Sequence, residues 1–162
     1  MEIVPLGEVH RHWVAESTAE HFGSRFVISL GRLHDTSALP GLVAVDDQDA
    51  TPVGFAVYSL RGVDCEIVAL VATAAGRGIG RGLVSAVAAT ARELGCERLV
   101  LVTTNDNVGA QAFYSACGFE LAATHVGAAT RAREIKPEIP LLGEGGVPIA
   151  DELEYRRALV YT

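Results

Sequence analysis

A run of glycines and arginines in the middle of the chain has the residue types and spacing that point most directly to chemistry. Glycine occupies every second position from Gly76 to Gly82, and Arg77 and Arg81 lie between these glycines. An apolar run before the segment, at residues 65–72, predicts a strand, and apolar residues at helical spacing follow it. A helix that begins at such a turn offers free backbone N–H groups and the positive end of its dipole to an anion. The segment therefore predicts a phosphate or pyrophosphate site, with a tight glycine turn that binds nothing as the alternative.

Two widespread phosphate-binding loops do not match this segment. The dinucleotide fingerprint GxGxxG fails in every register, because its third glycine is replaced by Arg81, Leu83 or Ser85. The loop of nucleoside triphosphatases fails as well, because no Gly-Lys-Ser or Gly-Lys-Thr follows the glycines. Nicotinamide chemistry and nucleotide hydrolysis are therefore disfavoured.

The pattern on either side predicts the elements that must position this turn. Strands are expected over 42–45, 53–60, 65–72, 98–103 and 119–125, and helices over 8–22, 83–94 and 107–117. The 65–72 run is apolar at nearly every position, which is typical of a strand at the centre of a sheet. Residues 34–41 predict a loop. Residues 135–148, with three prolines and three glycines, predict a loop or arm that leads to a final strand at 152–160.

The composition fits one globular domain over residues 1–162 and excludes several classes of protein. Hydrophobic residues make up 49% of the chain and charged residues 20%, which is enough apolar material for a core. A net charge of −7 disfavours nucleic-acid and polybasic membrane-surface partners. No apolar run approaches the roughly 20 residues of a membrane helix. Three dispersed cysteines favour a reducing, cytoplasmic setting, and no His or Cys spacing predicts a metal site.

Three segments in combination resemble the GNAT N-acetyltransferases. They are residues 66–72 (EIVALVA), 76–80 (GRGIG) and 107–119 (NVGAQAFYSACGF), and the resemblance covers about residues 40–125. It implies a mixed α/β fold with a mostly antiparallel sheet that is splayed at its central strand and flanked by helices. It also implies acetyl-CoA as co-substrate and an amine as acceptor. The C-terminal arm, residues 127–162, lies outside the motifs and resembles that of a bacterial subgroup of unknown substrate.

The resemblance also implies which residues bind acetyl-CoA. The main chain of the central strand would pair with the pantetheine arm at Leu70, Val71 and Ala72. The pyrophosphate would be held by the backbone amides of Arg77, Gly78, Ile79, Gly80 and Arg81. Asn107 matches an asparagine that lies near the pantetheine in the family. One position departs from the pattern, because Ala75 stands where the family usually has Arg or Gln.

Tyr114 is the candidate acid, because it matches the tyrosine that protonates the coenzyme A sulfur in the family. A phenol with a pKa of about 10 can deliver a proton to a thiolate of similar basicity. The alternative is a tyrosine that only packs in the core.

Glu66 is the candidate base, in a position similar to that of the catalytic glutamate in histone-acetylating members. Strict alternation along the strand would place it on the same face as Leu70, pointing toward the cofactor cleft. A glutamate in solvent, or paired with an arginine, is the alternative. His34, in the expected loop before the first hairpin strand, is a candidate substrate residue, with a solvated surface histidine as its alternative.

The predicted reaction is direct transfer of an acetyl group from acetyl-CoA to an amine of a small molecule or peptide, without a covalent enzyme intermediate. The alternatives are a non-catalytic acyl-CoA-binding sensor or interaction module, which Ala75 favours, and a transferase that uses a longer acyl donor. Net acidity favours a cationic acceptor, such as an aminoglycoside, a polyamine or a basic peptide terminus. The arm is expected to cover the acceptor side or to form a homodimer contact.

Overall fold

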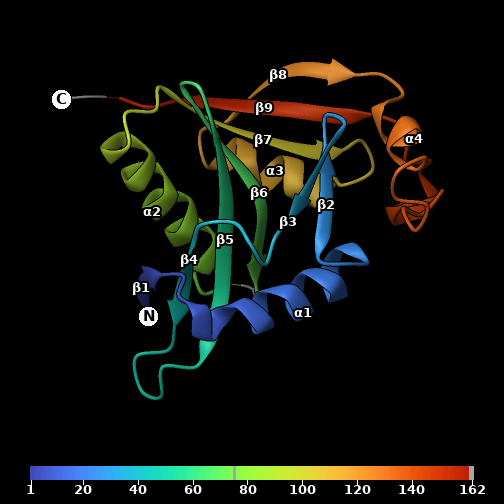
Figure 1. The fold of residues 1–162 in the computed structure, drawn as a ribbon. Helices are drawn as coiled ribbons and strands as arrows, with labels where there is room; N and C mark the ends of the chain where they lie inside the picture. The colour runs from blue at the N-terminus through green and yellow to red at the C-terminus, as the bar shows by residue number, and fades with distance from the viewer. Residues whose placement is uncertain (75, 161–162) are drawn as a thin grey trace.

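The computed structural model describes residues 1–74 and 76–160, and within them seven strands form one sheet in the order β1-β4-β5-β6-β7-β9-β8 (Figure 1). In chain order these strands are β1 (Glu2–Pro5), β4 (Gly41–Val45), β5 (Pro52–Arg61), β6 (Asp64–Ala72), β7 (Arg98–Thr104), β8 (Glu120–His125) and β9 (Glu152–Ala158). Neighbouring strands are antiparallel except β6 and β7, which run parallel. The mostly antiparallel sheet that the resemblance implied is confirmed.

The two faces of the sheet are covered by different elements. One face, which we call the α1 face, carries α1 (Arg11–Phe22) and the hairpin of β2 (Phe26–Ser29) and β3 (Arg32–Asp35) (Figure 1). The opposite face, the α2 face, carries α2 (Ile79–Glu93) and α3 (Val108–Ala116). A short helix, α4 (Ala128–Ala132), and two single 3₁₀ turns, η1 (Glu8–His10) and η2 (Glu144–Gly146), complete the described elements. None of the helices in the described residues is both long enough and apolar enough to cross a membrane.

Helix α2 shows how the apolar spacing builds the core. Leu83, Val87 and Ala91 recur on one side of the helix, and all three are fully buried against the sheet. Leu94, the last residue of the helix expected over 83–94, lies after the last helical turn and is 53% exposed. Gly95 follows with a φ of 81°, the left-handed conformation in which a glycine ends a helix at little cost.

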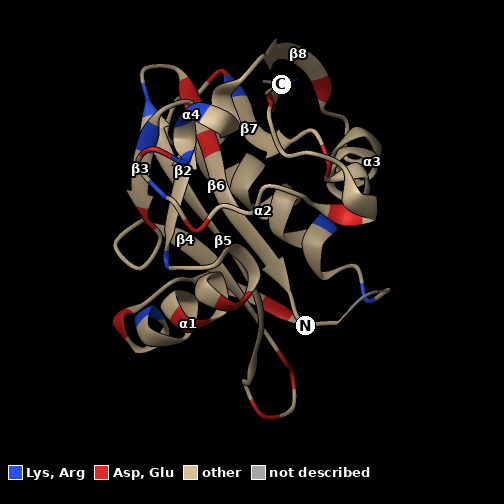
Figure 2. Ribbon diagram, turned by 90° about the vertical axis from the view of Figure 1, so that its right-hand side faces the viewer, with Lys and Arg blue, Asp and Glu red and all other residues tan. Residues whose placement is uncertain are grey.

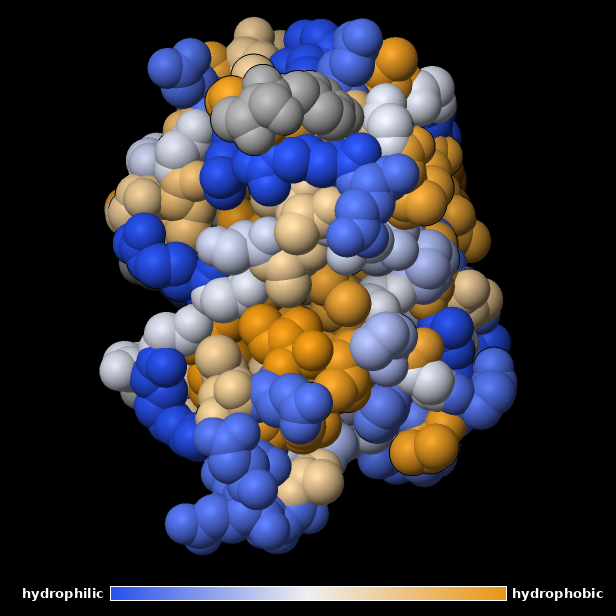
Figure 3. Space-filling model, turned by 90° about the vertical axis from the view of Figure 1, so that its left-hand side faces the viewer, coloured by the Kyte–Doolittle hydropathy of each residue, from blue (hydrophilic) through white to orange (hydrophobic). Residues whose placement is uncertain are grey.

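Strand β1 lies at the sheet edge beside α2. At Gly82 of α2 an added Cβ would lie 3.2 Å from Met1 Cε and 3.4 Å from Ile3 Cδ1, so this helix and the strand pack closely. Figure 3 looks onto the side where α2 and the N-terminus lie, and it shows an apolar area with more hydrophilic residues above and below it.

The loop that the sequence predicted over residues 34–41 is wrong at its start, because His34 and Asp35 belong to β3. The β2–β3 hairpin escapes sequence analysis because of its turn. Leu30 and Gly31 form the turn with φ values of 49° and 79°, a conformation that usually calls for Asn, Asp or Gly at the first position. A leucine there gives no turn signal.

The sheet opens between its two parallel strands. Pairing of β6 with β7 runs from Asp64–Arg98 to Ile67–Leu101 and stops, although β6 continues to Ala72. Beyond that point β6 stays bonded to β5, while β7 stays bonded to β9. The two halves of the sheet therefore diverge, which is the splay that the resemblance implied.

A β-bulge lies at the base of this opening. Ile67 pairs with Tyr58 and Ala69 pairs with Val57, so Val68 is an extra residue in β6. The bulge reverses the alternation of the strand: Ile67 packs on the α2 face, whereas Ala69 packs on the α1 face. Side chains before and after the bulge must therefore be assigned to faces separately.

Candidate active site

The turn between β6 and α2 exposes backbone N–H groups. Gly76 and Gly78 have φ values of 77° and 72°, and an added Cβ at either position would meet no described residue within 4 Å apart from its neighbours in the chain. The first backbone bond of α2 runs from Gly82 N–H to the carbonyl of Gly78, which is the N-cap. The N–H groups of the first turn, from Ile79 to Arg81, have no acceptor within the helix. These glycines and amides suit an anion; Ala75, where the family pattern departs, lies outside the described residues.

The two arginines of the turn are held by neighbouring elements. Arg77 Nη2 lies 3.7 Å from Asp46 Oδ2, on the acidic loop between β4 and β5. Arg81 Nη1 lies 3.5 Å from the carbonyl oxygen of Ala116, at the end of α3. Figure 2 shows the acidic residues of this loop and of α1 in red. The charge of Arg77 is therefore partly offset by Asp46, whereas Arg81 contacts an uncharged carbonyl oxygen and adds positive charge to the turn.

The end of β6 borders the opening with its main chain. Leu70, Val71 and Ala72 pair with β5 on one side, and no strand of the described residues pairs with them on the other. The main-chain groups on that second side are available to an extended ligand. On the far side of the opening Asn107 caps α3, where its Oδ1 accepts a 3.1 Å bond from the N–H of Ala110. The cofactor residues implied by the resemblance thus lie in the glycine turn, along the free edge of β6 and at the start of α3.

Tyr114 packs its ring in an aromatic group on the α2 face. Its centroid lies 5.2 Å from that of Phe113 and 5.7 Å from that of Phe119, both with edge-to-face geometry. Its hydroxyl makes no hydrogen bond to another described residue. Burial, with a smaller contribution from the Cys117 thiol, raises the pKa of Tyr114 to about 12. The phenol therefore stays protonated at neutral pH.

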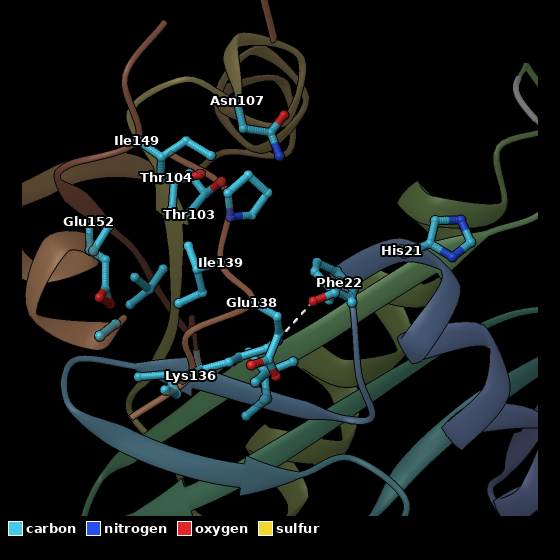
Figure 4. A pocket seen from close by; sticks show the side chains of 18 residues that line it. His21, Phe22, Thr103, Thr104, Asn107, Lys136, Glu138, Ile139, Ile149 and Glu152 are labelled. Atoms are coloured by element: carbon cyan, nitrogen blue, oxygen red, sulfur yellow. Dashed lines mark hydrogen bonds between the residues drawn. The ribbon is translucent and has the colours of Figure 1, made fainter. Parts of the chain in front are cut away.

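A cavity of about 400 Å³ lies over the opening, on the α1 face (Figure 4). Its floor contains Val68 at the bulge and residues Val102 to Thr104 of β7, and Asn107 lies at its edge. Its roof is formed by the end of α1, by β2 and by the C-terminal arm. None of these arm residues can be recognised as a cavity residue from the sequence, because a loop rich in proline and glycine gives no sign of what it packs against.

Lys136 fastens the arm over this cavity. Its Nζ donates to the carbonyl oxygens of Phe22 and Phe26, at 2.8 and 2.7 Å, and the bond to Phe22 is drawn in Figure 4. The side chain is buried, and burial lowers the pKa of Lys136, partly countered by the charge of Glu138. The contact joins the arm to both ends of the α1–β2 connection.

Glu66 lies beneath the β2–β3 hairpin and does not line the cavity. It is 6% exposed, and its two oxygens accept bonds from Ser29 Oγ at 2.5 Å and from Arg32 Nη2 at 3.1 Å. The prediction that it shares a face with Leu70 is wrong, because the bulge at Val68 reverses the alternation between them. The ion pair with Arg32 matches the alternative given for Glu66 in the sequence, a glutamate that is paired with an arginine.

His34 lies in β3, on the sheet side of the hairpin, and it is buried rather than solvated. Burial lowers the pKa of His34, with Glu66 opposing and Arg32 and Arg61 adding to the shift. Among the described residues, its Nε2 is a buried atom without a hydrogen-bond partner. The hairpin thus brings His34 and Glu66 together, but away from the walls of the cavity.

Two further buried carboxylates lie on β9. Both oxygens of Glu154 are engaged, by His125 Nε2 at 2.9 Å and by Arg156 Nε at 2.6 Å. Burial alone would raise the pKa of Glu154, but these two hydrogen bonds lower it. Glu152, in contrast, lines the cavity, and it accepts one 2.8 Å bond, from the N–H of Leu30 to Oε1. Burial raises the pKa of Glu152. This residue was not predicted as a site residue, because the apolar residues of its strand do not alternate regularly.

Comparison with known proteins agrees with this arrangement. The chain matches the model of the acetyltransferase (GNAT) family over residues 8–119. Two Bacillus subtilis relatives are described as uncharacterized proteins. YdhI is 35% identical and covers 98% of this chain and 99% of its own length, and YxbD is 37% identical with coverages of 94% and 96%.

Solved structures share the fold at lower identity. An IAA acetyltransferase from Bacillus cereus superposes with a TM-score of 0.70 at 19% identity, covering 98% of this chain and 99% of the other. A Bacillus subtilis acetyltransferase in complex with CoA gives a TM-score of 0.69 at 17% identity, with the same coverage. Because the family model spans more than half of the sequence, and because two relatives match nearly all of it, this chain belongs to the GNAT acetyltransferase family.

Proposed function

We propose that this protein transfers an acetyl group from acetyl-CoA to an amine by direct attack in a ternary complex. The observation that carries the proposal is the opening between β6 and β7, which joins the glycine turn at one end to the cavity at the other. An extended thioester needs such a slot, with an anion site for its diphosphate and unpaired main chain along its arm. Family members crystallised with CoA or acetyl-CoA support this donor.

The donor would be held mainly by backbone. The amides of residues 77–81 would bind the diphosphate at the start of α2, where the helix dipole also favours negative charge. The main chain of residues 70–72 would pair with the pantetheine, and Asn107 would face it from α3. This arrangement directs the acetyl group toward the bulge at Val68 and into the cavity.

Tyr114 is the proposed acid. When the amine nitrogen attacks the thioester carbonyl, the carbon–sulfur bond breaks and its electron pair passes to sulfur. The Tyr114 hydroxyl, which is protonated and has no partner among the described residues, would give that sulfur a proton. A raised pKa weakens a phenol as an acid, but a thiolate in the same desolvated surroundings is also a stronger base.

Glu66 is the proposed base. Because its carboxylate does not reach the cavity wall, the proton of the amine would pass through an intervening group. The Ser29 hydroxyl donates to Glu66 Oε2 at 2.5 Å and would be the inner step of this path, accepting one proton as it gives up its own. Because Ser29 does not line the cavity either, a water molecule would connect it to the amine. Main-chain N–H groups of β6 would stabilise the negative oxygen of the tetrahedral intermediate.

The test combines calorimetry with an assay of thiol release from acetyl-CoA in the presence of amines. We expect the wild-type protein to bind coenzyme A and to release thiol with at least one amine. Tyr114→Phe and Glu66→Gln should each lower kcat and leave coenzyme A affinity nearly unchanged. Tyr155→Phe removes a phenol from the core outside the proposed site and serves as the matched control.

Three outcomes would count against parts of the proposal. If coenzyme A does not bind, the donor site is wrong. If it binds but no amine releases thiol, a non-catalytic sensor with this fold is the better interpretation. If both variants keep wild-type rates across pH, the roles of Tyr114 and Glu66 are wrong.

A further inference from the structure

The walls of the cavity over the opening are mostly hydrocarbon. Aliphatic and aromatic side chains line it from the α1 end, β2, the bulge, β7 and the arm: Phe22, Val27, Val68, Val102, Ile139 and Ile149. Figure 4 shows Ile139 and Ile149 reaching into the space from the arm, with Phe22 on the opposite side. A ligand that fills this cavity would therefore be favoured if most of its own surface were apolar, since that surface would be buried against these side chains.

Among the charged side chains that line the cavity, the carboxylate of Glu152 has one oxygen without a hydrogen-bond donor from the described residues. Lys136 already donates to two backbone carbonyls, and Glu138 is exposed. Glu152 is 3% exposed and uses one oxygen to accept the Leu30 N–H, while its other oxygen accepts no hydrogen bond from a described residue. His125 and Arg131 act on Glu152 only through space, since His125 is bonded to Glu154. A buried carboxylate in this state favours a cationic donor.

We infer that the acceptor is a primary amine with a compact apolar body, and that its ammonium group binds Glu152. The inference rests on the proposed function and specifies its acceptor. An ammonium group at Glu152 would satisfy the second carboxylate oxygen, and the body would pack against the apolar roof. The ammonium proton would then pass to Glu66 by the path proposed above, and the lone pair of the free amine would attack the acetyl carbon at the bulge, beside Val68.

The same walls argue against more polar amines. A polyamine or an aminoglycoside would leave several charges or hydroxyls against hydrocarbon, and the polar side chains of the lining would replace only part of the hydrogen bonds that these groups make to water. An amino acid would bring a carboxylate next to Glu152 and Glu138. The arm forms much of this roof and lies beyond the segment matched by the family model, residues 8–119, so the acceptor class is set outside the family motifs.

The test compares amines of matched size in the thiol-release assay. 2-Phenylethylamine is the probe, and phenylalanine is its matched control, because it has the same body and one added carboxylate. Spermidine, kanamycin and a lysine-rich peptide represent the polar acceptors. We expect kcat/KM for 2-phenylethylamine to exceed that for each of the others by about tenfold or more, because burial of its ring favours it over the polar acceptors and the absence of a carboxylate near Glu152 favours it over phenylalanine.

Glu152→Gln tests the anchor itself. The amide keeps an oxygen that can accept the Leu30 N–H and removes the charge. We expect KM for 2-phenylethylamine to rise by about 10- to 100-fold, which is the effect of losing a hydrogen bond to a charged group. Unfolding temperature and coenzyme A affinity should stay close to wild type. Glu134→Gln, which alters an exposed glutamate that does not line this cavity, is the control.

The outcomes separate this inference from the proposed function. Turnover of spermidine, kanamycin, peptide or phenylalanine in preference to 2-phenylethylamine would leave the transferase intact and overturn the apolar acceptor. An unchanged KM in Glu152→Gln would overturn the anchor. Absence of turnover with every amine, despite coenzyme A binding, would overturn the proposed function and this inference with it.

Discussion

Gly54 lies where β5 meets the start of α2, and a single methyl group there should disturb the donor site from beneath. An added Cβ would lie 2.6 Å from Ile79 Cγ2, 2.8 Å from the Val71 carbonyl oxygen and 3.2 Å from Leu83 Cδ1. The Ile79 side chain can move only with the first turn of α2, and the Val71 oxygen belongs to the neighbouring strand. Gly54→Ala should therefore push the helix start away from the sheet.

The size of this effect follows from two opposing contributions. Overpacking a dense core by one methyl group costs about 1–3 kcal/mol, and contact with a backbone atom places this site in the upper part of that range. Replacing a strand glycine by alanine returns roughly 0.5–1 kcal/mol of chain entropy. We expect a net loss of about 1–2 kcal/mol in the free energy of unfolding, or a fall in Tm of about 2–8 °C.

The assay is thermal unfolding together with calorimetry of coenzyme A. Coenzyme A should bind Gly54→Ala several-fold more weakly, because the N–H groups proposed to hold its diphosphate move with Ile79. Gly109→Ala is the control. Gly109 lies in α3, and its added Cβ would meet no described residue within 4 Å outside its own stretch of helix, so alanine should stabilise the helix by about 0.5–1 kcal/mol. A Gly54→Ala protein with wild-type Tm and wild-type affinity would refute the idea that β5 sets the position of the anion site.

Two further predictions concern buried titratable groups. Burial lowers the pKa of His34 below its usual 6.5, so below pH 6.5 the unfolded chain binds more protons than the folded protein. The contribution of His34 to stability is therefore fully present above pH 6.5 and is lost as the pH falls through its folded-state pKa. In urea titrations between pH 5 and 8 the difference between wild type and His34→Asn should shrink as pH falls, and a constant difference would contradict the assignment. Lys136→Met should leave two carbonyl oxygens without their donor and cost about 1–3 kcal/mol, read as a lower Tm and faster proteolysis of the arm, and an unchanged Tm would show that the arm is held by other contacts.

The central elements of this fold are predictable because their signals are local. The apolar run of β6 and the stripe of Leu83, Val87 and Ala91 need only their own periodicity to be recognised. The cap of α3 is similar, because Asn107 bonds a backbone group three residues ahead. The glycine turn was predicted from its composition, and its φ values show why glycine is needed at positions 76 and 78.

The sequence-based predictions were wrong where a single residue departs from the usual alternation of a strand or from the usual residue preferences of a turn. The bulge at Val68 adds a residue to β6, so the assumption that side chains alternate strictly along the strand placed Glu66 on the wrong face of the sheet. Leu30 adopts a positive φ in the β2–β3 turn, and no propensity rule places a hairpin there. The backbone N–H of this same residue donates to Glu152, so the unusual turn and the buried carboxylate are parts of one arrangement.

The cavity itself depends on contacts that no local pattern carries. Lys136 reaches the Phe22 carbonyl across 114 positions of sequence, and Glu152 meets the Leu30 N–H across 122. Both contacts join the C-terminal part of the chain to the α1–β2–β3 segment, so the roof and the anchor of the cavity form only when these two distant segments meet. The glycine turn can therefore be recognised in the sequence whatever the shape of the acceptor cavity. The residues proposed to select the acceptor, in contrast, become neighbours only in the folded molecule. For that reason exchange of the arm between relatives, with the glycine turn left intact, should change the preferred amine and leave coenzyme A binding as it was.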